Sequence, residues 1–300
     1  MALQEMQSAG QSINTIVIVE SLRDELHTGK KLSEGSLVQI CTQRGGGPTF
    51  LEVRTKDSLF ATLLELSERA GKNGTRPVLH IEAHGCPLGL SLSGEREPIP
   101  WSELAPSLRS INHAAANNVL LVLACCHGRD SLTGFFDILK PSPFCTAIAC
   151  DAEVTAGQIE KFNAFYAHLF NSFAPHEAAA KTLPNFRFYS AEAFFVEFWV
   201  RLLVEVSRGR VRQAMLEEQV SRQRLLTRNE LSLGDLRGLI RPQLSVDSDH
   251  YRRSFYAMRS IFLVADHPEN TGRFSIDFDA VLVKALDRKN RLQAPSGVKR

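Results

Sequence analysis

VLLVLACCHG, residues 119–128, is the clearest fold signal in this chain. Its first six residues are a continuous apolar run of the kind found in strands buried on both faces of a parallel sheet. A second run, PVLHIEAHG at residues 77–85, stops in the same way at His84 and Gly85. Because chemistry in open parallel sheets lies beyond the carboxyl ends of the strands, the predicted site is where these two runs end.

Strand and helix patterns alternate over the first two thirds of the chain. Strands are predicted at residues 15–19, 36–42, 50–54, 78–83, 119–124 and 144–150, with a small hairpin edge at 88–93. Helices are predicted at 57–70 with Asp57 as cap, at 101–116 with Ser102 as cap, at 131–139, at 158–173 and from 176 onward. Each connection is long enough for a crossover, so the pattern predicts an α/β domain whose mostly parallel sheet is flanked by helices. We assign residues 13–190 to this domain and expect residues 1–12 to be a flexible tail.

The sequence changes character after residue 190. Residues 191–227 form a long helical pattern that is apolar at first and then rich in Arg and Glu, with Gly209 as a bending point. Pro242 breaks the helical pattern. We therefore expect residues 191–300 to be a mainly helical C-terminal extension. Its helices offer a surface for an activating protein partner or for a second protomer.

The composition is that of an ordinary globular protein, with 44% hydrophobic and 23% charged residues. The net charge of +2 favours no polyanionic partner, so we expect no binding to nucleic acid. No apolar run approaches the roughly 20 residues of a membrane span, and the first residues lack the pattern of an export signal. Six cysteines without such a signal indicate free thiols in a reducing compartment, so we expect a cytoplasmic protein that does not bind membranes.

The residues at the two strand ends suit nucleophilic catalysis by a thiol. An unperturbed cysteine holds little thiolate at neutral pH, so a cysteine nucleophile needs a neighbouring imidazole. Adjacent strands are about 4.8 Å apart, which lets His84 and either Cys125 or Cys126 face one substrate carbonyl. The backbone N–H groups of Gly85 and of the nucleophilic cysteine would form an oxyanion hole. This mechanism needs no cofactor and no metal.

The two strand ends resemble the motifs of caspase-like cysteine peptidases. Those enzymes carry Q-A-C-[RQG]-G with a histidine about 50 residues upstream. Here ACCHG at 124–128 follows His84, and 42 residues (126 − 84) separate that histidine from Cys126. The resemblance covers about residues 13–185. It implies that Cys126 is the nucleophile, that His84 exchanges protons with it, and that Cys125 is a core residue.

Several phrases around these motifs are similar to the CHAT branch of the caspase-like superfamily. They are WSEL at 101–104, and FNAFYAHL at 162–169 followed by HEAAAK at 176–181. The general caspase-like resemblance rests on IEAHG at 81–85 together with LACCHG at 123–128. Bacterial CHAT-like proteases are often executioner or antiviral defence enzymes that a partner switches on. The resemblance therefore implies a regulated cysteine endopeptidase that cleaves protein or peptide substrates.

The metacaspases of the same superfamily suggest how a substrate pocket is built. Their acidic residue two positions before the nucleophile is replaced here by Ala124, whereas IACD at 148–151 is similar to their second acid-bearing motif. The resemblance implies that Asp151 helps to line a pocket for Arg or Lys at P1, the substrate residue before the scissile bond. His127 is either a loop residue or a further part of that pocket.

Other interpretations of the same residues are weaker. One is a catalytically silent pseudo-peptidase whose fold serves as an interaction module. A zinc site built from Cys86, Cys125, Cys126 and His127 is disfavoured because adjacent cysteines chelate poorly and the chain has no C-x2-C pair. A different thiol or serine hydrolase of the α/β type is disfavoured because no G-x-S-x-G elbow occurs. If the strand register differs by one residue, Cys125 replaces Cys126 as the nucleophile.

Overall fold

The computed structural model describes residues 6–8, 11–22, 27–42, 47–172, 174–226 and 230–293. Its contacts divide the chain into two compact units. The first contains the described residues up to Glu192 together with the later segment Ile261–Arg273. The second contains Ala193–Ser260 and the described residues from Phe274 onward. The sequence pattern did not predict that a segment beyond residue 190 belongs to the first unit.

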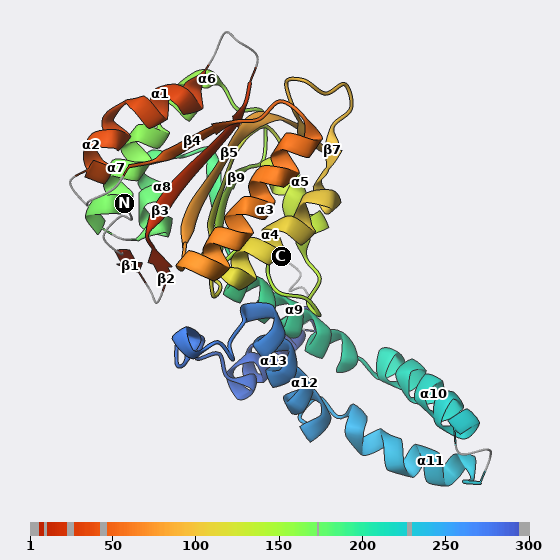
Figure 1. Ribbon diagram of the computed structural model, residues 1–300. Helices are drawn as coiled ribbons and strands as arrows, with labels where there is room; N and C mark the ends of the chain where they lie inside the picture. Colours follow the sequence, from red (N-terminus) through yellow and green to blue (C-terminus); the bar gives the residue numbers. More distant parts are fainter. Residues whose placement is uncertain are drawn as a thin grey trace, which may run out of the picture. The chain divides into compact units, whose positions relative to one another are not determined.

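The first unit is built around one large, mostly parallel sheet (Figure 1). In spatial order its strands are β4 (Thr49–Glu52), β3 (Thr15–Ser21), β5 (Pro77–Cys86), β8 (Leu120–Ala124), β9 (Thr146–Cys150) and β10 (Phe186–Ser190). Neighbouring strands are parallel except at one edge, where β10 runs antiparallel to β9. The short strands β6 (Gly89–Ser91) and β7 (Ile99–Pro100) extend from the end of β5. The predicted fold class is therefore confirmed.

Helices cover both faces of this sheet (Figure 1). One face packs against α3 (Lys56–Asn73), α4 (Trp101–Ala114) and α5 (Gly128–Phe135). The other packs against α1 (Thr28–Glu34), α2 (Ser36–Thr42), α7 (Phe162–Ser172) and α8 (Pro175–Thr182). Along β8, Leu121 and Leu123 point into the first core, and Leu120, Val122 and Ala124 point into the second. The run VLLVLA is thus a strand buried on both faces, as predicted.

The helices of the first face begin at caps other than the predicted ones. Helix α3 starts behind a capping box formed by Thr55 and Ser58, so the prediction of Asp57 as its cap is wrong. It ends at Gly74, whose φ of 64° lies in the left-handed region that glycine tolerates best. Helix α4 starts behind Pro100 without any side-chain cap, so the prediction of Ser102 as a cap is also wrong.

Two secondary-structure predictions fail on the other face and at the sheet edge. Residues 36–42 form helix α2 rather than a strand, because Leu37 and Cys41, one helical turn apart, are both fully buried. The predicted helix at 158–173 is divided into α6 (Ala156–Ile159) and α7. The edge strand β10 was not predicted. Its sequence, FRFYS, mixes polar and aromatic residues instead of forming an apolar run.

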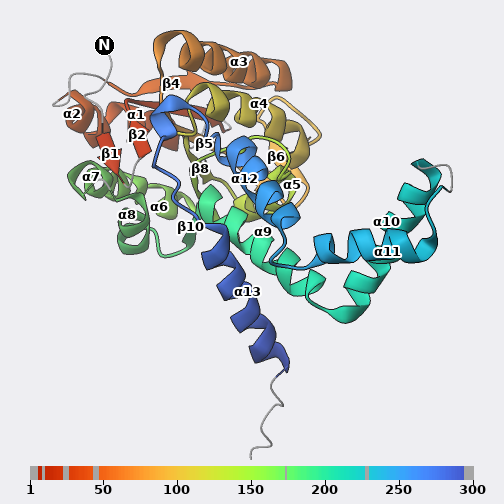
Figure 2. The same cartoon turned by 90° about the horizontal axis from the view of Figure 1, so that it is seen from below.

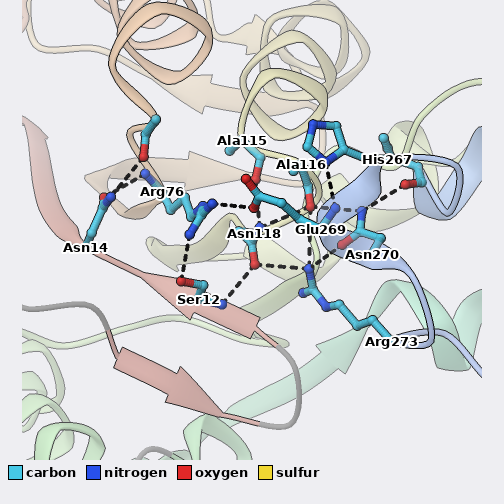
Figure 3. Close-up of polar contacts among 12 residues, drawn as sticks. Ser12, Asn14, Arg76, Ala115, Ala116, Asn118, His267, Glu269, Asn270 and Arg273 are labelled. Carbon is cyan, nitrogen blue, oxygen red and sulfur yellow. Dashed lines mark hydrogen bonds and ion pairs between the residues drawn. The ribbon is translucent and has the colours of Figure 1, made fainter.

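The segment Ile261–Arg273 is joined to the rest of the first unit by a polar network (Figure 3). Arg273 Nη1 donates to Asn118 Oδ1 at 3.0 Å and to the Ala116 carbonyl at 3.4 Å. Asn270 Nδ2 donates to the same Ala116 carbonyl at 3.1 Å. These residues of the segment therefore bind the turn that precedes β8, at the amino ends of the parallel strands.

The same network includes residues that the sequence pattern assigned to a flexible tail. The Ser12 backbone N–H donates to Asn118 Oδ1 at 2.8 Å, and the Ser12 hydroxyl accepts from Arg76 Nη1 at 3.0 Å (Figure 3). Ser12 belongs to β2 (Gln11–Ile13), which pairs with β1 (Met6–Ser8). The tail prediction is wrong for these residues, and residues 1–5 and 9–10 lie outside the described parts.

The second unit is helical, as predicted for this region. Its complete elements are α10 (Gly209–Leu226), α11 (Leu233–Ile240), the 3₁₀ turn η1 (Arg241–Leu244) and α13 (Phe278–Gln293). It also contains α9 (Ala191–Val206) from Ala193 onward and α12 (Asp249–Leu263) up to Ser260. Helices α10 and α11 lie side by side (Figure 2). A core is formed by the aromatic rings of Phe195, Trp199, Phe255 and Phe278. Within the described residues, no helix has both the length and the apolar character that a membrane span requires.

Candidate active site

His84 and Cys126 are brought together by the pairing of β5 with β8. In this parallel pair Glu82 lies opposite Ala124, and His84 and Cys126 each follow two residues later. The strand pairing ends at Glu82 and Ala124, and it brings the segments with His84 and Cys126 to the same edge of the sheet. Both residues line one pocket of about 50 Å³ at the carboxyl ends of the strands.

Cys126 is half-buried in the turn that follows β8. Its Sγ accepts the backbone N–H of Val154 at 3.2 Å and lies 3.9 Å from the Val154 carbonyl oxygen. Val154 follows β9, so the next strand of the sheet supplies the polar groups around the sulfur. The nucleophile candidate is therefore held in one orientation by the backbone of a neighbouring loop.

Cys125 is placed on the opposite side of the sheet from Cys126. Its side chain is 1% exposed and packs with Leu121 and Leu123 in the core under α3 and α4. Burial, with smaller contributions from Cys126 and Cys150, raises the pKa of the Cys125 thiol well above its usual range. A thiol that is buried and protonated is inert, so the geometry favours Cys126 over Cys125 as the nucleophile.

His84 is exposed where β5 leaves the main sheet and continues into the hairpin with β6. It pairs with Ser91 in that hairpin. No hydrogen bond joins His84 to Cys126, although the structure describes both residues. Catalytic pairs are often held apart before substrate binds, so this spacing leaves a proton exchange between them feasible.

Gly85 is required by a close approach of two backbones. A Cβ on this residue would lie 2.1 Å from the carbonyl oxygen of Cys126 and 3.4 Å from the Cβ of Cys125. Only glycine fits at that distance, and its absence of a side chain sets the backbone of β5 directly beside Cys126. The backbones of Gly85 and Cys126 are thus neighbours in space, with the Cys126 carbonyl directed at Gly85.

His127 does not line the pocket. It precedes α5 with a left-handed φ of 56°, and its backbone N–H donates to the Ala152 carbonyl at 3.2 Å. Its ring Nδ1 lies 3.5 Å from Asp130 Oδ2. The sequence allowed His127 to be either a loop residue or a pocket residue. In the structure it is a loop residue, and its backbone hydrogen bond joins the turn after β8 to the loop after β9.

Asp151 does not line the pocket either. Its carboxylate lies 3.2 Å from Arg129 Nη1 and 3.7 Å from Arg187 Nε, and it accepts the Tyr189 hydroxyl at 3.3 Å. Burial, followed by the charge of Asp151, raises the pKa of Tyr189 to about 12. Because two arginines already neutralise this acid, the geometry gives no support to its role in binding a basic P1 residue.

A chain of buried polar side chains that the sequence analysis did not single out lies next to the pocket. Glu82 is fully buried in β5, where it accepts the hydroxyl of Thr28 and lies 3.5 Å from His80 Nε2. His80 Nδ1 in turn lies 2.9 Å from the hydroxyl of Tyr166. Burial raises the pKa of Glu82, with His80 opposing that effect. Thr28 is the member of this chain that lines the pocket.

Glu20 occupies the position opposite Glu82 on the adjacent strand β3. Its Oε2 accepts the backbone N–H of Gly29 at 2.6 Å and that of Lys30 at 3.3 Å, while Oε1 lies 3.3 Å from His27 Nδ1. The carboxylate therefore caps the start of α1 and fixes the position of the neighbouring Thr28. The sequence held a signal for Glu82, which is a charged residue inside the predicted strand 78–83, and a weaker one for Glu20, which directly follows the predicted strand 15–19.

All six cysteines are free thiols. Among the residues that the structure describes, no group of three or more His, Cys, Asp or Glu side chains is arranged to hold a metal ion. The four residues considered for zinc, which are Cys86, Cys125, Cys126 and His127, are thus not brought together as ligands. Compared with protein-family models and with curated proteins, the chain shows no match.

Proposed function

We propose that this protein is a cysteine endopeptidase whose catalytic pair is His84 and Cys126. The observation that carries the proposal is the pocket that these two residues share. They come from different strands, 42 positions apart (126 − 84), and the β5–β8 register sets them at the same height. The alternative nucleophile Cys125 faces the opposite core.

In the proposed reaction, Cys126 Sγ attacks the scissile carbonyl of a peptide and His84 takes the thiol proton. The negative oxygen of the tetrahedral intermediate is bound by the backbone N–H groups of Gly85 and Cys126. His84 then gives its proton to the leaving amine, and a thioester to Cys126 remains. A water molecule, deprotonated by His84, hydrolyses that thioester and restores the thiol. No cofactor takes part in these steps.

The resemblance to caspase-like peptidases, and within them to the CHAT branch, also suggests a biological role. It supports a cytoplasmic, regulated bacterial effector protease of the kind used in antiviral defence. The helices of the second unit are the proposed binding surface for an activating protein or for a second protomer. The hydrogen bond from Val154 to Cys126 Sγ is compatible with such regulation, because substrate must compete with that loop for the sulfur.

One observation favours a second function, that of a catalytically silent interaction module. His84 and Cys126 share a pocket without a hydrogen bond between them, and Cys126 Sγ is already bound to Val154. A pseudo-peptidase would keep this arrangement permanently. The two functions differ in whether the Cys126 thiol ever reacts with a peptide carbonyl.

A mixed library of fluorogenic peptides, offered in parallel to wild type, Cys126→Ala and Cys125→Ala, tests the proposal. We expect wild type and Cys125→Ala to cleave peptides and Cys126→Ala to be inactive. Loss of cleavage in Cys125→Ala alone would identify the other cysteine as the nucleophile. If wild type cleaves nothing, even with its thiol reduced and with candidate activating proteins added, the interaction module is the better description.

A further inference from the structure

The pocket beside Cys126 is unusual in the chemistry of its walls. Apart from His84, Cys125 and Cys126, the pocket is lined by Leu22, Thr28, Ala83, Ala124, Val154, Ala156 and Ile159. None of these side chains carries a charge, and Thr28 is the only one among them with a polar atom. The pocket therefore offers an aliphatic environment directly beside the proposed nucleophile.

The position of these walls relates the pocket to the residue before the scissile bond. Leu22 follows β3, Ala83 and His84 belong to β5, Ala124 ends β8 and Val154 follows β9. Four neighbouring parallel strands therefore border the pocket. Cys126 lines the same pocket and is covalently linked to Ala124 through Cys125. A peptide whose scissile carbonyl meets Cys126 Sγ brings the side chain next to that carbonyl, the P1 side chain, to the border of this space.

Neither of the nearby acids can serve a basic P1 side chain. Glu82 is 0% exposed, and the hydroxyl of Thr28 donates to it, so Thr28 separates the carboxyl group from the pocket. Asp151 lies outside the pocket lining and is paired with Arg129 and Arg187. An acidic P1 side chain also lacks a partner here, because no lysine or arginine is among the lining residues. A charged side chain would be desolvated here without a partner.

The size of the pocket further limits which P1 side chains it can accept. Its volume of about 50 Å³ corresponds to space for about four water molecules, at roughly 10–15 Å³ each. An aliphatic side chain of one to four carbon atoms matches this space more closely than a phenylalanine side chain of seven carbon atoms does. Displacing water from aliphatic walls with an aliphatic group is favourable, so apolar contact replaces charge as the source of selectivity.

We propose that this pocket is the P1 subsite and that it selects small, uncharged aliphatic residues such as Ala, Val and Leu. This inference rests on the proposed peptidase function. It differs from the basic P1 preference that the resemblance to metacaspases implied for Asp151. Val154 is then a specificity-determining residue, because its side chain lines the pocket from a half-exposed loop that tolerates substitution better than the buried walls do.

The test uses the full chain and irreversible peptidyl acyloxymethyl ketones that differ only at P1. Probes with Ala, Val, Leu, Phe, Arg or Asp at P1 are offered to wild type, and the rate of adduct formation at Cys126 is followed by intact-protein and peptide mass spectrometry. We expect the aliphatic probes to react at least about tenfold faster than those with Phe, Arg or Asp. Val154→Asp should raise the rate with the Arg probe relative to Val, whereas Asp151→Asn should keep the wild-type ranking.

The outcomes separate the inference from the function on which it rests. Adducts at Cys126 that form fastest with Arg, Asp or Phe would overturn the aliphatic subsite and leave the peptidase intact. If the ranking of the P1 probes changes in Asp151→Asn, Asp151 contributes to P1 selection and the aliphatic pocket alone does not determine it. If no probe modifies Cys126 in wild type while iodoacetamide does, the thiol is reactive but no peptide subsite exists, and both proposals fail. The wild-type ranking decides the question even if a variant does not fold.

Discussion

Gly85 lies so close to Cys126 that a Cβ atom on Gly85 would be 2.1 Å from the Cys126 carbonyl oxygen. This contact links the two strand-end motifs of the sequence, AHG and ACCHG, into one structural unit. The residue after His84 is therefore glycine because two backbones approach each other there, and not because a turn requires it. The same contact fixes the turn that presents the Cys126 thiol.

Replacing Gly85 with alanine should therefore damage both stability and the site. We expect Gly85→Ala to lower the free energy of unfolding by about 1–3 kcal/mol, because the strand or the turn after β8 must move. Urea denaturation followed by circular dichroism measures this change, and the rate of alkylation of Cys126 reports on the site.

A matched control for this substitution is Gly71→Ala in α3. The nearest atom to a Cβ on Gly71 is the Ala114 Cβ at 4.0 Å, which is ordinary contact, and alanine is the better helix former. Gly71→Ala should leave stability unchanged or raise it by up to about 1 kcal/mol. Equal stability of the Gly85→Ala and Gly71→Ala variants would show that the backbone contact at Gly85 is not tight.

The two adjacent cysteines should differ sharply in reactivity. Both cysteines border the pocket, but Cys125 is 1% exposed and burial raises the pKa of its thiol, whereas Cys126 is half-buried. We expect iodoacetamide to modify Cys126 in the native protein at least about a hundredfold faster than Cys125, since only an accessible thiolate reacts. Peptide mapping by mass spectrometry gives both rates, and unfolding in urea should make them similar. Comparable native rates would place both thiols at the surface and contradict the assigned register.

The sequence predicted the parts of the site that depend on local pattern. The apolar runs before Ala124 and His84 identified β8 and β5, and alternation along a strand was enough to expect one cysteine in the core. The run at residues 36–42 misled because its apolar residues satisfy a strand and a helical turn equally well, and only packing of Leu37 and Cys41 against one core selects the helix.

Other features could not be predicted because they depend on contacts between distant residues. The pairing of Glu20 with Glu82 requires the β3–β5 register, which no local pattern contains. The return of Ile261–Arg273 to the first unit joins residues more than 150 positions apart, as between Asn270 and Ala116. The residues lining the pocket come from two strands, from α1 and α6, and from the segments that follow β3, β8 and β9. The sequence therefore suggested Asp151 where the structure places Val154.

The segment that returns to the first unit should contribute measurably to its stability. Arg273 donates to Asn118 Oδ1 and to the Ala116 carbonyl, and it also lies 3.0 Å from Cys145 Sγ. Arg273→Ala removes these donors from buried acceptors, which should lower the free energy of unfolding by about 2 kcal/mol. Lys72→Ala, which breaks an exposed pair with Glu68 in α3, should cost no more than about 0.5 kcal/mol. Urea denaturation of the two variants compares them, and equal losses would mean that the network in Figure 3 adds no stability.

The buried carboxyl group of Glu82 should make stability depend on pH. Burial raises its pKa above the ordinary value of 4.5, so the folded protein holds this proton more tightly than the unfolded chain does. The stability contributed by protonated Glu82 is complete below about pH 4.5 and is lost as the pH rises through the folded-state pKa. Glu82→Gln keeps an acceptor for Thr28 and stays neutral throughout, so it should gain stability relative to wild type with rising pH. Urea denaturation of both proteins at about pH 5 and about pH 8 measures the difference. Parallel pH profiles for the two proteins would show that Glu82 has the same pKa folded and unfolded, and that the polar chain beside the pocket stores no proton.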